Sequence, residues 1–282
     1  MIWKIKATTL HLERPLIMGI LNLTPDSFSD GGQFLDPDQA LGRAIRLVQD
    51  GADILDLGAE STRPNASIIS EQEELDRLLP VLSRVAREIQ IPISIDTTKP
   101  AVAKEALSLG ASIINDVSGL RQNSKLGQVV SQEGAGIVLM HRRGTPETMQ
   151  LMTDYHDVME DVIRELSESL QIAESCGISP EKIVLDPGIG FSKKPEQNFE
   201  LLERLKELES LNRPVLIGPS RKSFIGAVTK QAPDKRLMGT VAACILAFER
   251  GAKIFRVHDV WALKEALAVS EAILNTGKQV VG

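Results

Sequence analysis

Residues 91–116 read IPISIDTTKPAVAKEALSLGASIIND and contain one complete repeat of the organisation that runs through the chain. A short apolar run ends at Asp96, and Pro100 opens a segment with helical spacing of its apolar residues. Gly110 follows that segment, before a second apolar run that ends at Asn115. Proline suits the first turn of a helix and glycine the position just after its end. The stretch therefore predicts a strand, a helix and a second strand.

The same unit recurs along the 282 residues. Eight short apolar runs are continuous rather than alternating, as is typical of parallel strands covered on both faces. They span residues 16–21, 54–57, 93–95, 113–114, 137–140, 183–185, 215–217 and 253–257. Helix-like segments separate them, so the pattern predicts an α/β protein, a TIM (β/α)8 barrel. A doubly wound open sheet is the alternative, and the count of eight argues against it.

The first residues do not fit this repeat. Residues 1–12 alternate loosely between apolar and polar, which favours a short N-terminal hairpin. We therefore expect residues 1–15 to form a hairpin or plug and residues 16–282 to form a single barrel domain.

Composition excludes several classes of protein. Hydrophobic residues make up 43% of the chain and charged residues 25%, so intrinsic disorder is excluded as the dominant state. The net charge of −6 offers no overall basic field for nucleic acid. Cys176 and Cys244 are too few for a disulfide scaffold or a cysteine-rich zinc site. No apolar run near the N-terminus is long enough to span a membrane, so we expect a cytoplasmic protein that binds neither nucleic acid nor membrane.

Polar residues stand at the C-terminal ends of all eight predicted strands. In chain order they are Asn22, Asp56 with the segment 58–64, Asp96, Asn115, His141, Asp186, the segment 220–222, and Arg256 with His258. In a TIM barrel these ends face the same side, where active sites are built. Helix caps alone would not require such groups at every end, so the pattern predicts one shared site.

Two sectors of different chemistry are expected within that site. Asp96, Asn115 and Asp186 supply acceptors and one amide, which suits a flat heterocycle that carries several N–H groups. A second, cationic set suits an anion with many oxygens, such as a diphosphate. It comprises Arg63, Lys222, Arg256 and His258. Asn22 is a neutral oxygen ligand that would help to hold Mg²⁺ beside the phosphates.

Two carboxylates next to site-facing residues are expected to point the other way. Asp116 follows Asn115 and Asp259 follows His258, and neighbouring residues on a strand face opposite sides. We expect both to act as caps or ion-pair partners. For His141 the sequence leaves a structural and a functional role equally open.

Eight motifs carry a resemblance to a known family. They are MGILNLTPDSFSDGG at 18–32, GAESTRP at 58–64, SIDTTKP at 94–100, INDVSG at 114–119, LMHRRGTPETMQ at 139–150, LDPGIGF at 185–191, GPSRKSFIG at 218–226 and RVHDV at 256–260. In this content and order the chain closely resembles the dihydropteroate synthase family. Departures are small: Ala59 stands where many relatives carry Gly, and Arg142–Arg143 stand where Met or Gln is common.

The resemblance implies an enzyme of folate biosynthesis. Such enzymes join 6-hydroxymethyl-7,8-dihydropterin diphosphate to 4-aminobenzoate and release 7,8-dihydropteroate and pyrophosphate. It also implies a TIM barrel, Mg²⁺ as cofactor, competition by sulfonamides, and a homodimer formed through late helices.

The resemblance further assigns roles to individual positions. The pterin would be held by Asp96, Asn115, Met140, Asp186 and Lys222; the diphosphate and Mg²⁺ by Asn22, Arg63, Arg256 and His258; and the aminobenzoate by Phe28, Thr62, Phe191 and Ser220. Asp30 would belong with Phe28 to a loop near the site. The catalytic set would be Arg63, Asp96, Lys222, Arg256 and His258.

These residues fit a dissociative, Mg²⁺-assisted substitution that needs no covalent nucleophile. The sequence contains no GxSxG, no HExxH and no cysteine near a predicted strand end. Three other functions are considered. A folate methyltransferase-type barrel would not need the cationic set, a sugar-phosphate aldolase would need a Schiff-base lysine inside a strand or a metal triad, and a non-catalytic pterin-binding homologue would not need both sectors intact.

Overall fold

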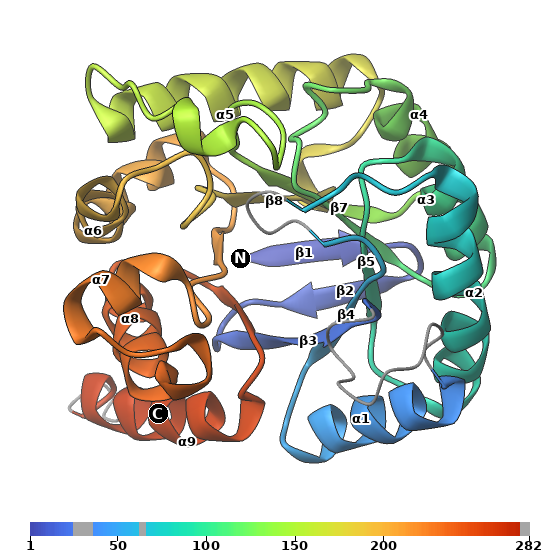
Figure 1. The fold of residues 1–282 in the computed structure, drawn as a ribbon, viewed down its shortest axis with the longest axis horizontal. Helices are drawn as coiled ribbons and strands as arrows, with labels where there is room; N and C mark the ends of the chain where they lie inside the picture. The colour runs from blue at the N-terminus through green and yellow to red at the C-terminus, as the bar shows by residue number, and fades with distance from the viewer. Residues whose placement is uncertain (25–35, 62–65, 277–282) are drawn as a thin grey trace, which may run out of the picture.

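The computed structural model describes residues 1–24, 36–61 and 66–276, and within them the chain forms a ring of helices around a central sheet (Figure 1). The strands are β1 Ile2–Ile5, β2 Thr8–His11, β3 Leu16–Asn22, β4 Ile54–Gly58, β5 Ile93–Asp96, β6 Ile113–Asp116, β7 Gly136–Met140, β8 Ile183–Asp186, β9 Leu216–Ile217 and β10 Ile254–Val257. The α-helices are α1 Pro37–Gln49, α2 Glu71–Glu88, α3 Pro100–Ser108, α4 Lys125–Glu133, α5 Val158–Ser175, α6 Pro195–Glu203, α7 Ser223–Thr229, α8 Leu237–Glu249 and α9 Val260–Leu274.

Strands β3 to β10 form one parallel sheet that curls into a barrel. Their order is β8-β7-β6-β5-β4-β3-β10-β9, and a bridge between Leu185 and Val215 joins β8 to β9. Each predicted apolar run coincides with one of these strands. The TIM-barrel prediction is thereby confirmed, and the open-sheet alternative is wrong because the two outer strands of the order meet.

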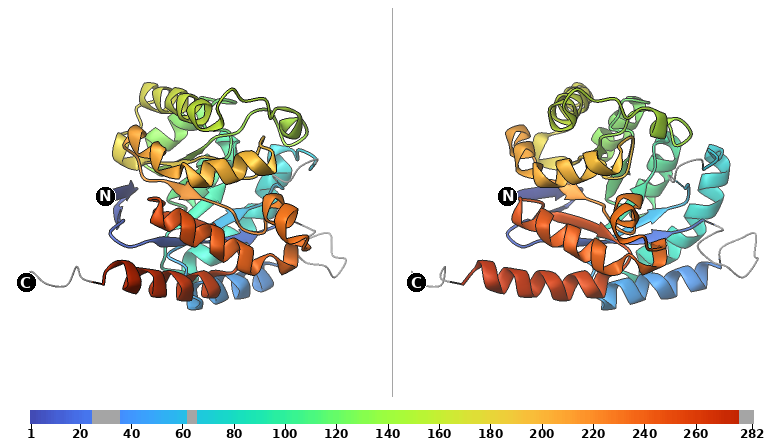
Figure 2. Two further views of the ribbon diagram at one scale, coloured as in Figure 1. Left: turned by 90° about the vertical axis from the view of Figure 1, so that its left-hand side faces the viewer. Right: turned by 60° about the vertical axis from the view of Figure 1, so that its left-hand side comes forward.

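The helices begin where the local sequence supplies a suitable start. Pro37, Pro100 and Pro195 each occupy the first turn of a helix, and the sequence predicted this for Pro100. Ser70 caps α2, because its hydroxyl accepts a hydrogen bond from the backbone N–H of Glu73 at 3.1 Å. Two further views show the helices packed around the outside of the strands (Figure 2). Among the described residues, no helix is both long and apolar enough to cross a membrane.

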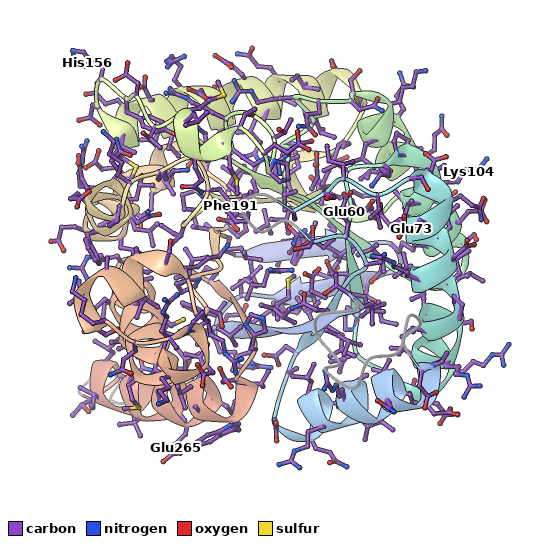
Figure 3. The ribbon with its side chains drawn as sticks, in the orientation of Figure 1. Glu60, Glu73, Lys104, His156, Phe191 and Glu265 are labelled. Atoms are coloured by element: carbon purple, nitrogen blue, oxygen red, sulfur yellow. The ribbon has the colours of Figure 1, made fainter. Side chains whose placement is uncertain are left out.

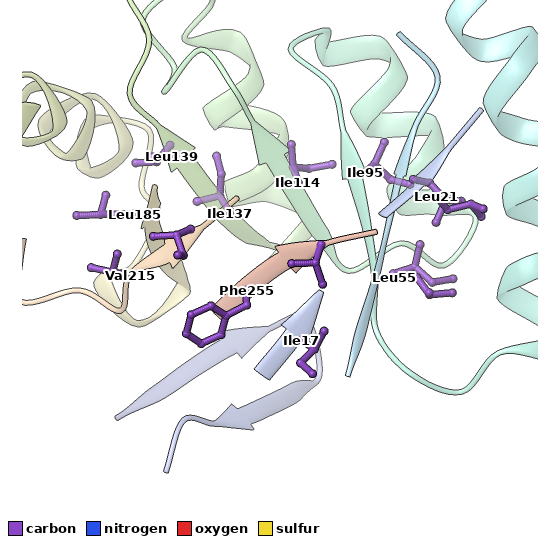
Figure 4. Packing of buried hydrophobic residues seen from close by; sticks show 14 of the residues in the cluster. Ile17, Leu21, Leu55, Ile95, Ile114, Ile137, Leu139, Leu185, Val215 and Phe255 are labelled. Carbon is purple, nitrogen blue, oxygen red and sulfur yellow. The ribbon is translucent and has the colours of Figure 1, made fainter. Parts of the chain in front are cut away.

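Alternate residues of each strand face opposite sides of the barrel wall. One set fills the barrel interior and is apolar apart from the buried Ser94 of β5: Leu16, Met18, Ile54, Ile113, Val138, Val184, Leu216 and Ile254. The other set packs beneath the helices and includes Ile17, Leu55, Ile95, Ile114, Ile137, Leu185 and Phe255 (Figure 4). Most of the next inward positions, toward the C-terminal ends of the strands, carry polar side chains: Asp56, Asp96, Asn115, Asp186 and Arg256.

The N-terminal hairpin closes the opposite end of the barrel. Strands β1 and β2 pair antiparallel, and Trp3 and Ile5 belong to the same buried cluster as the interior strand residues. The Trp3 indole Nε1 donates to the carbonyl oxygen of Lys182 at 2.9 Å, just before β8 begins. A side chain at Gly136 would place its Cβ 2.5 Å from Ile5 Cγ2, so only glycine fits at the start of β7. The predicted hairpin is therefore confirmed.

Both cysteines are free thiols. Cys244 is buried in α8, whereas Cys176, at the end of α5, is only partly buried. The partial exposure arises because Cys176 ends an amphipathic helix at the surface.

Candidate active site

Strand pairing sets several predicted site residues in one row around the barrel mouth. Asn22 of β3 lies opposite Gly58 of β4, Gly58 lies opposite Asp96 of β5, and Asp96 lies opposite Asn115 of β6. In the same way Met140 of β7 lies opposite Asp186 of β8. Residues that are paired across a sheet share a face, so the side chains point into the mouth together.

Arg256 connects the two predicted sectors. Its guanidinium donates from Nε to Asp56 Oδ2 at 2.6 Å and from Nη2 to Asp96 Oδ2 at 2.8 Å. The sequence placed Arg256 with the anion-binding groups, but it also lies against the acceptor that was expected to hold a heterocycle. Its charge therefore acts on both sectors.

Asp56 was among the polar residues named at the strand ends, but neither predicted sector included it. Its side chain is fully buried, and Oδ2 also accepts from Asn115 Nδ2 at 3.4 Å. Oδ1 is buried and has no hydrogen-bond partner. The sequence contains a signal for this position. Asp56 is the one charged residue in an apolar run and stands two positions after the inward-facing Ile54, so its carboxylate is expected to face inward too.

The buried carboxylates at the mouth are hard to ionise. Burial raises the pKa of Asp96, and the nearby negative charge of Asp56 raises it further. The positive charge of Arg256 lowers this pKa, but by less than burial raises it. Burial also raises the pKa of Asp186 to about 6, although its Oδ1 accepts from the backbone N–H of Gly188 at 2.7 Å. A ligand that donates hydrogen bonds to these oxygens would stabilise their charged forms.

His258, Ser220 and Asn22 form a second group at the mouth. His258 Nδ1 lies 2.9 Å from Ser220 Oγ, and His258 Nε2 lies 3.4 Å from Asn22 Nδ2. Burial lowers the pKa of His258 to about 3, and the charges of Arg221 and Arg256 add to the effect. The sequence places His258 with the cations, whereas this lowered pKa favours the neutral form of its ring while no anion is bound. The reason is desolvation beside two arginines, and a bound anion would raise the pKa of His258 again.

Lys222 and Phe191 lie in contact. Lys222 Nζ is 3.7 Å from the centroid of the Phe191 ring, a cation–π contact between the loop before α7 and the loop after β8. Phe191 also belongs to an apolar cluster with Val117, Met140 and Met149. It lies near the centre of the molecule, whereas His156, Lys104 and Glu265 lie at its rim (Figure 3). An apolar wall and a lysine thus adjoin the acceptor sector.

The two carboxylates left out of the site have structural roles, as predicted. Asp116 accepts from the backbone N–H groups of Ser118 at 2.8 Å and Leu120 at 2.6 Å, and so closes the turn after β6. Asp259 accepts two hydrogen bonds from the Arg221 guanidinium, at 2.7 and 3.1 Å. Both therefore hold loops that border the mouth.

His141 joins a buried charged cluster at the end of β7. Its Nε2 lies 3.2 Å from Glu165 Oε2, and its Nδ1 lies 2.9 Å from Lys193 Nζ. Arg143 also binds Glu165, and its guanidinium carbon lies 3.9 Å from the centroid of the Tyr155 ring. Nothing in the sequence distinguishes these buried ionic residues from ordinary surface charges.

Arg142 is buried as well, at 6% exposure, and its Nε has no hydrogen-bond partner. Burial lowers its pKa, which the charges of Asp116, Asp96 and Glu60 partly offset. The two neighbouring arginines therefore have different surroundings. Arg143 lies within the ionic cluster, whereas Arg142 lacks a hydrogen-bond partner for its Nε.

Some predicted site residues lie outside the described part of the chain: Phe28, Asp30, Thr62 and Arg63. Their assigned roles stay predictions. Within the described residues no group of three or more His, Cys, Asp or Glu side chains is placed to hold a metal ion.

Comparison with known proteins gives a family assignment that covers nearly the whole barrel. A family model described as pterin binding enzyme matches residues 18–258. The chain is 48% identical over 262 residues to the dihydropteroate synthase of Synechocystis sp., a match that covers 93% of this chain and 91% of the relative. The chain belongs to the dihydropteroate synthase family. It is thus a transferase of folate biosynthesis, and the resemblance in the motifs is confirmed.

Further members of the dihydropteroate synthase family agree in sequence and in structure. The Bacillus subtilis enzyme is 44% identical, over 95% of this chain and 91% of its own. A Yersinia pestis dihydropteroate synthase structure with a sulfonamide drug has a TM-score of 0.93 and 42% identity, covering 98% of this chain and 100% of that one. A Xanthomonas albilineans dihydropteroate synthase structure with 4-aminobenzoic acid has a TM-score of 0.89 and 43% identity, covering 97% and 96%. These relatives are synthases, not methyltransferases or aldolases, so those alternatives are wrong.

Proposed function

We propose that this enzyme joins 6-hydroxymethyl-7,8-dihydropterin diphosphate to 4-aminobenzoate, forming 7,8-dihydropteroate and pyrophosphate. One observation carries the proposal: buried acceptors and a bridging arginine share the barrel mouth with a lysine stacked on an aromatic ring. The similarity to synthases whose structures were determined with 4-aminobenzoic acid and with a sulfonamide supports it.

The pterin would occupy the acceptor sector. Asp96 and Asp186 would accept hydrogen bonds from the N–H groups of the ring, and the Asn115 amide offers both a donor and an acceptor. Met140 and Lys222 would lie against the ring, because both adjoin Phe191 at the same side of the mouth. Buried acceptors of this kind reject ligands that leave them unpaired.

The diphosphate would lie beside Arg256 and His258. Arg256 would supply charge, and His258 would donate a hydrogen bond. Arg63 is expected to add a further cation. Asn22 fits a role in binding Mg²⁺, since its amide is within reach of His258 at this same side. One amide oxygen is a weak site by itself, so the diphosphate oxygens and water would complete the shell, and the ion would neutralise the charge of the leaving group.

The aminobenzoate would bind against Phe191 and Ser220, with Phe28 and Thr62 expected to complete its pocket. Phe191 is 7% exposed and presents a flat apolar surface next to Lys222. Sulfonamides, as analogues of aminobenzoate, would compete there.

A dissociative substitution is the mechanism that these groups would support. The C–O bond between the pterin methylene and the diphosphate breaks, and its electron pair leaves with the diphosphate. Asp96 and Asp186 would stabilise the cationic pterin methylene that remains, and Arg256 would stabilise the departing anion. The arylamine nitrogen then bonds to the methylene and loses a proton.

Pyrophosphate release tests the proposed function directly. It should require the pterin diphosphate and 4-aminobenzoate together, and neither alone. Release without aminobenzoate, or no release with both, would contradict the proposal. Positional isotope exchange in the diphosphate tests the stepwise mechanism, since a reversible C–O cleavage scrambles the bridging oxygen.

Mg²⁺ dependence has its own test. Chelation should abolish turnover, and Asn22→Ala should raise the Mg²⁺ concentration needed for half-maximal rate. Full activity in chelator would contradict the assignment of Mg²⁺.

We also propose that the chain forms a homodimer through α7 and α8. Several large apolar side chains are exposed there, including Val228 at 67%, Met238 at 76% and Leu246 at 49%. Phe199, Phe224 and Ala243 line an apolar groove in the same region. Patches of this kind often mark protein–protein contacts. Light scattering should give a mass of two chains for the wild type. Met238→Glu should shift the measured mass toward that of a single chain. A monomeric wild type would contradict this proposal.

A cytoplasmic location is the remaining proposal. Its support is the two cysteines, both free thiols in this structure. Cell fractionation should recover the protein with soluble cytoplasmic markers.

A further inference from the structure

The segment 187–193, which follows β8, connects two groups of the proposed active site. It starts directly after Asp186 and carries Phe191, on which Lys222 stacks. Its backbone is left-handed at Gly188, Gly190 and Ser192, with φ of 71°, 84° and 47°. Such a sequence of conformations is not favoured locally, particularly for Ser192, so tertiary contacts must hold it.

Lys193 supplies several of those contacts from the end of the segment, beside a hydrogen bond from the Tyr155 hydroxyl to the Ser192 carbonyl at 3.0 Å and one from the Gly190 N–H to Asn198 Oδ1 at 2.6 Å. Its side chain is 3% exposed, and Nζ donates to the carbonyl oxygens of Gly188 at 3.2 Å and Phe191 at 3.0 Å. The third neighbour is His141 Nδ1 at 2.9 Å. An ammonium group has three N–H donors, so this geometry uses all of them.

The third contact ties the segment to the rest of the barrel. His141 is fully buried on its side-chain atoms, and burial together with the charge of Lys193 lowers its pKa to about 3. Its ring is therefore neutral, with Nδ1 accepting from Lys193 and Nε2–H donating to Glu165. Burial alone would raise the pKa of Glu165, but hydrogen bonds from His141, Arg143 and Arg121 lower it. The chain Glu165–His141–Lys193 thus links α5 and β7 to the segment.

We propose that Lys193 is a positioning residue of this active site, an inference that rests on the proposed function. Its ammonium group folds the segment 187–193 onto His141, so that Asp186 and Phe191 face the pterin diphosphate in the right geometry. Lys193 also places a positive charge close to Asp186. It touches no substrate and acts only through these two residues.

The charge of Lys193 gives the proposal a specific signature. Several charged groups face Asp186 and Lys193 from the surrounding elements: Arg143, Glu165, Lys222 and Arg256. The charges of Lys222, Lys193 and Arg256 all oppose the burial that raises the pKa of Asp186. Burial lowers the pKa of Lys193 to about 7, so Lys193 is charged where Asp186 titrates. Removing the charge of Lys193 should therefore raise the pKa of Asp186 further.

Lys193→Met tests both consequences in the full-length enzyme. Calorimetric binding of the pterin diphosphate should weaken about tenfold or more, as expected when a charged group with three buried hydrogen bonds is lost. The acid limb of kcat/KM should move to higher pH by about half a unit or more. Lys182→Met is the matched control, because Lys182 Nζ donates to Gly134 at the opposite end of the barrel. It should change neither quantity.

A second pair of variants keeps the test open if Lys193→Met does not fold. His141→Leu removes the third acceptor, whereas His141→Asn keeps an amide oxygen near the position of Nδ1. We expect weaker pterin diphosphate binding in His141→Leu and recovery in His141→Asn. If the wild type and Lys193→Met bind the pterin diphosphate equally and the acid limb of kcat/KM does not move, the inference about Lys193 is overturned. The proposed function is not affected by that outcome. A wild type that neither binds nor turns over pterin diphosphate overturns the proposed function, and the inference with it.

Discussion

The two ends of the barrel are built on the same strands but carry opposite kinds of side chain. At the N-terminal end, Trp3 and Ile5 of the hairpin are buried among the apolar interior residues. At the C-terminal mouth, two positions further along the same inward faces, the buried Asp56 and Asp96 form an ionic group with the partly buried Arg256. One end excludes water with a plug, and the other holds charged groups out of water.

This difference separates stability from function. Apolar burial stabilises without requiring partners, whereas a buried carboxylate is unfavourable unless it is paired. Burial raises the pKa of Asp96 and Asp186, so the mouth disfavours their charges in the absence of substrate. We therefore expect substitutions in the plug to change the free energy of unfolding, and substitutions at the mouth to change catalysis.

Trp3→Ala should give the largest effect on stability. Trp3 is fully buried and its indole N–H is hydrogen-bonded, so removal should lower the free energy of unfolding by about 3–5 kcal/mol. KM values of the folded variant should stay close to wild type. Denaturant titration measures the change. Trp261→Ala is the control, because Trp261 is 54% exposed and its removal should lower the free energy of unfolding much less. Equal losses of stability in the two variants would contradict the role of the plug.

Arg256→Ala should give the largest effect on catalysis. It removes the charge expected to stabilise the departing diphosphate, about 2–4 kcal/mol of transition-state stabilisation, so kcat/KM should fall by about 10² or more. Arg256→Lys should recover part of the rate, because a lysine keeps the charge but cannot bridge Asp56 and Asp96. A loss below about threefold in steady-state kinetics would remove Arg256 from the mechanism.

Asp186→Asn should stabilise the protein while it impairs the enzyme. The pKa of Asp186 in the folded protein is about 6, above its usual 3.8, so its ionised form disfavours folding above pH 6. Neutralising it should raise the free energy of unfolding by about 1–3 kcal/mol at pH 8. The gain should shrink as pH falls from 6 to 4, because wild-type Asp186 then takes up a proton. A variant that is less stable than wild type at pH 8 would show that the carboxylate is not strained.

Arg14→Ala should give the smallest effect. Arg14 pairs with Asp53 at the N-terminal end, at 2.5 and 3.1 Å, but its side chain is 51% exposed. Exposed ion pairs contribute about 0–1 kcal/mol. Thermal melting should detect little change and kcat/KM none, and a loss as large as that of Trp3→Ala would mean that ionic pairs matter as much as the plug at this end.

Much of the site was predictable because its signals are local. Asp96, Asn115 and Asp186 each end an apolar run, and the parallel order of the strands brings such ends together. Asp56 was named at its strand end but received no role, because it lies inside its apolar run rather than after it. Lys193 and Glu165 gave no signal, since a buried ionic residue and a surface one have the same local sequence.

The sequence by itself determined the eight strands, the helix starts, the family and the residues at the strand ends, because hydropathy period, caps and motifs are written within short stretches. Only the tertiary structure decided the direction of the pKa shift of His258, the partners of Arg256 and the contacts of Lys193. Those properties depend on burial and on groups brought together from distant parts of the chain. Desolvation and Coulomb interactions follow distance in space rather than distance in sequence.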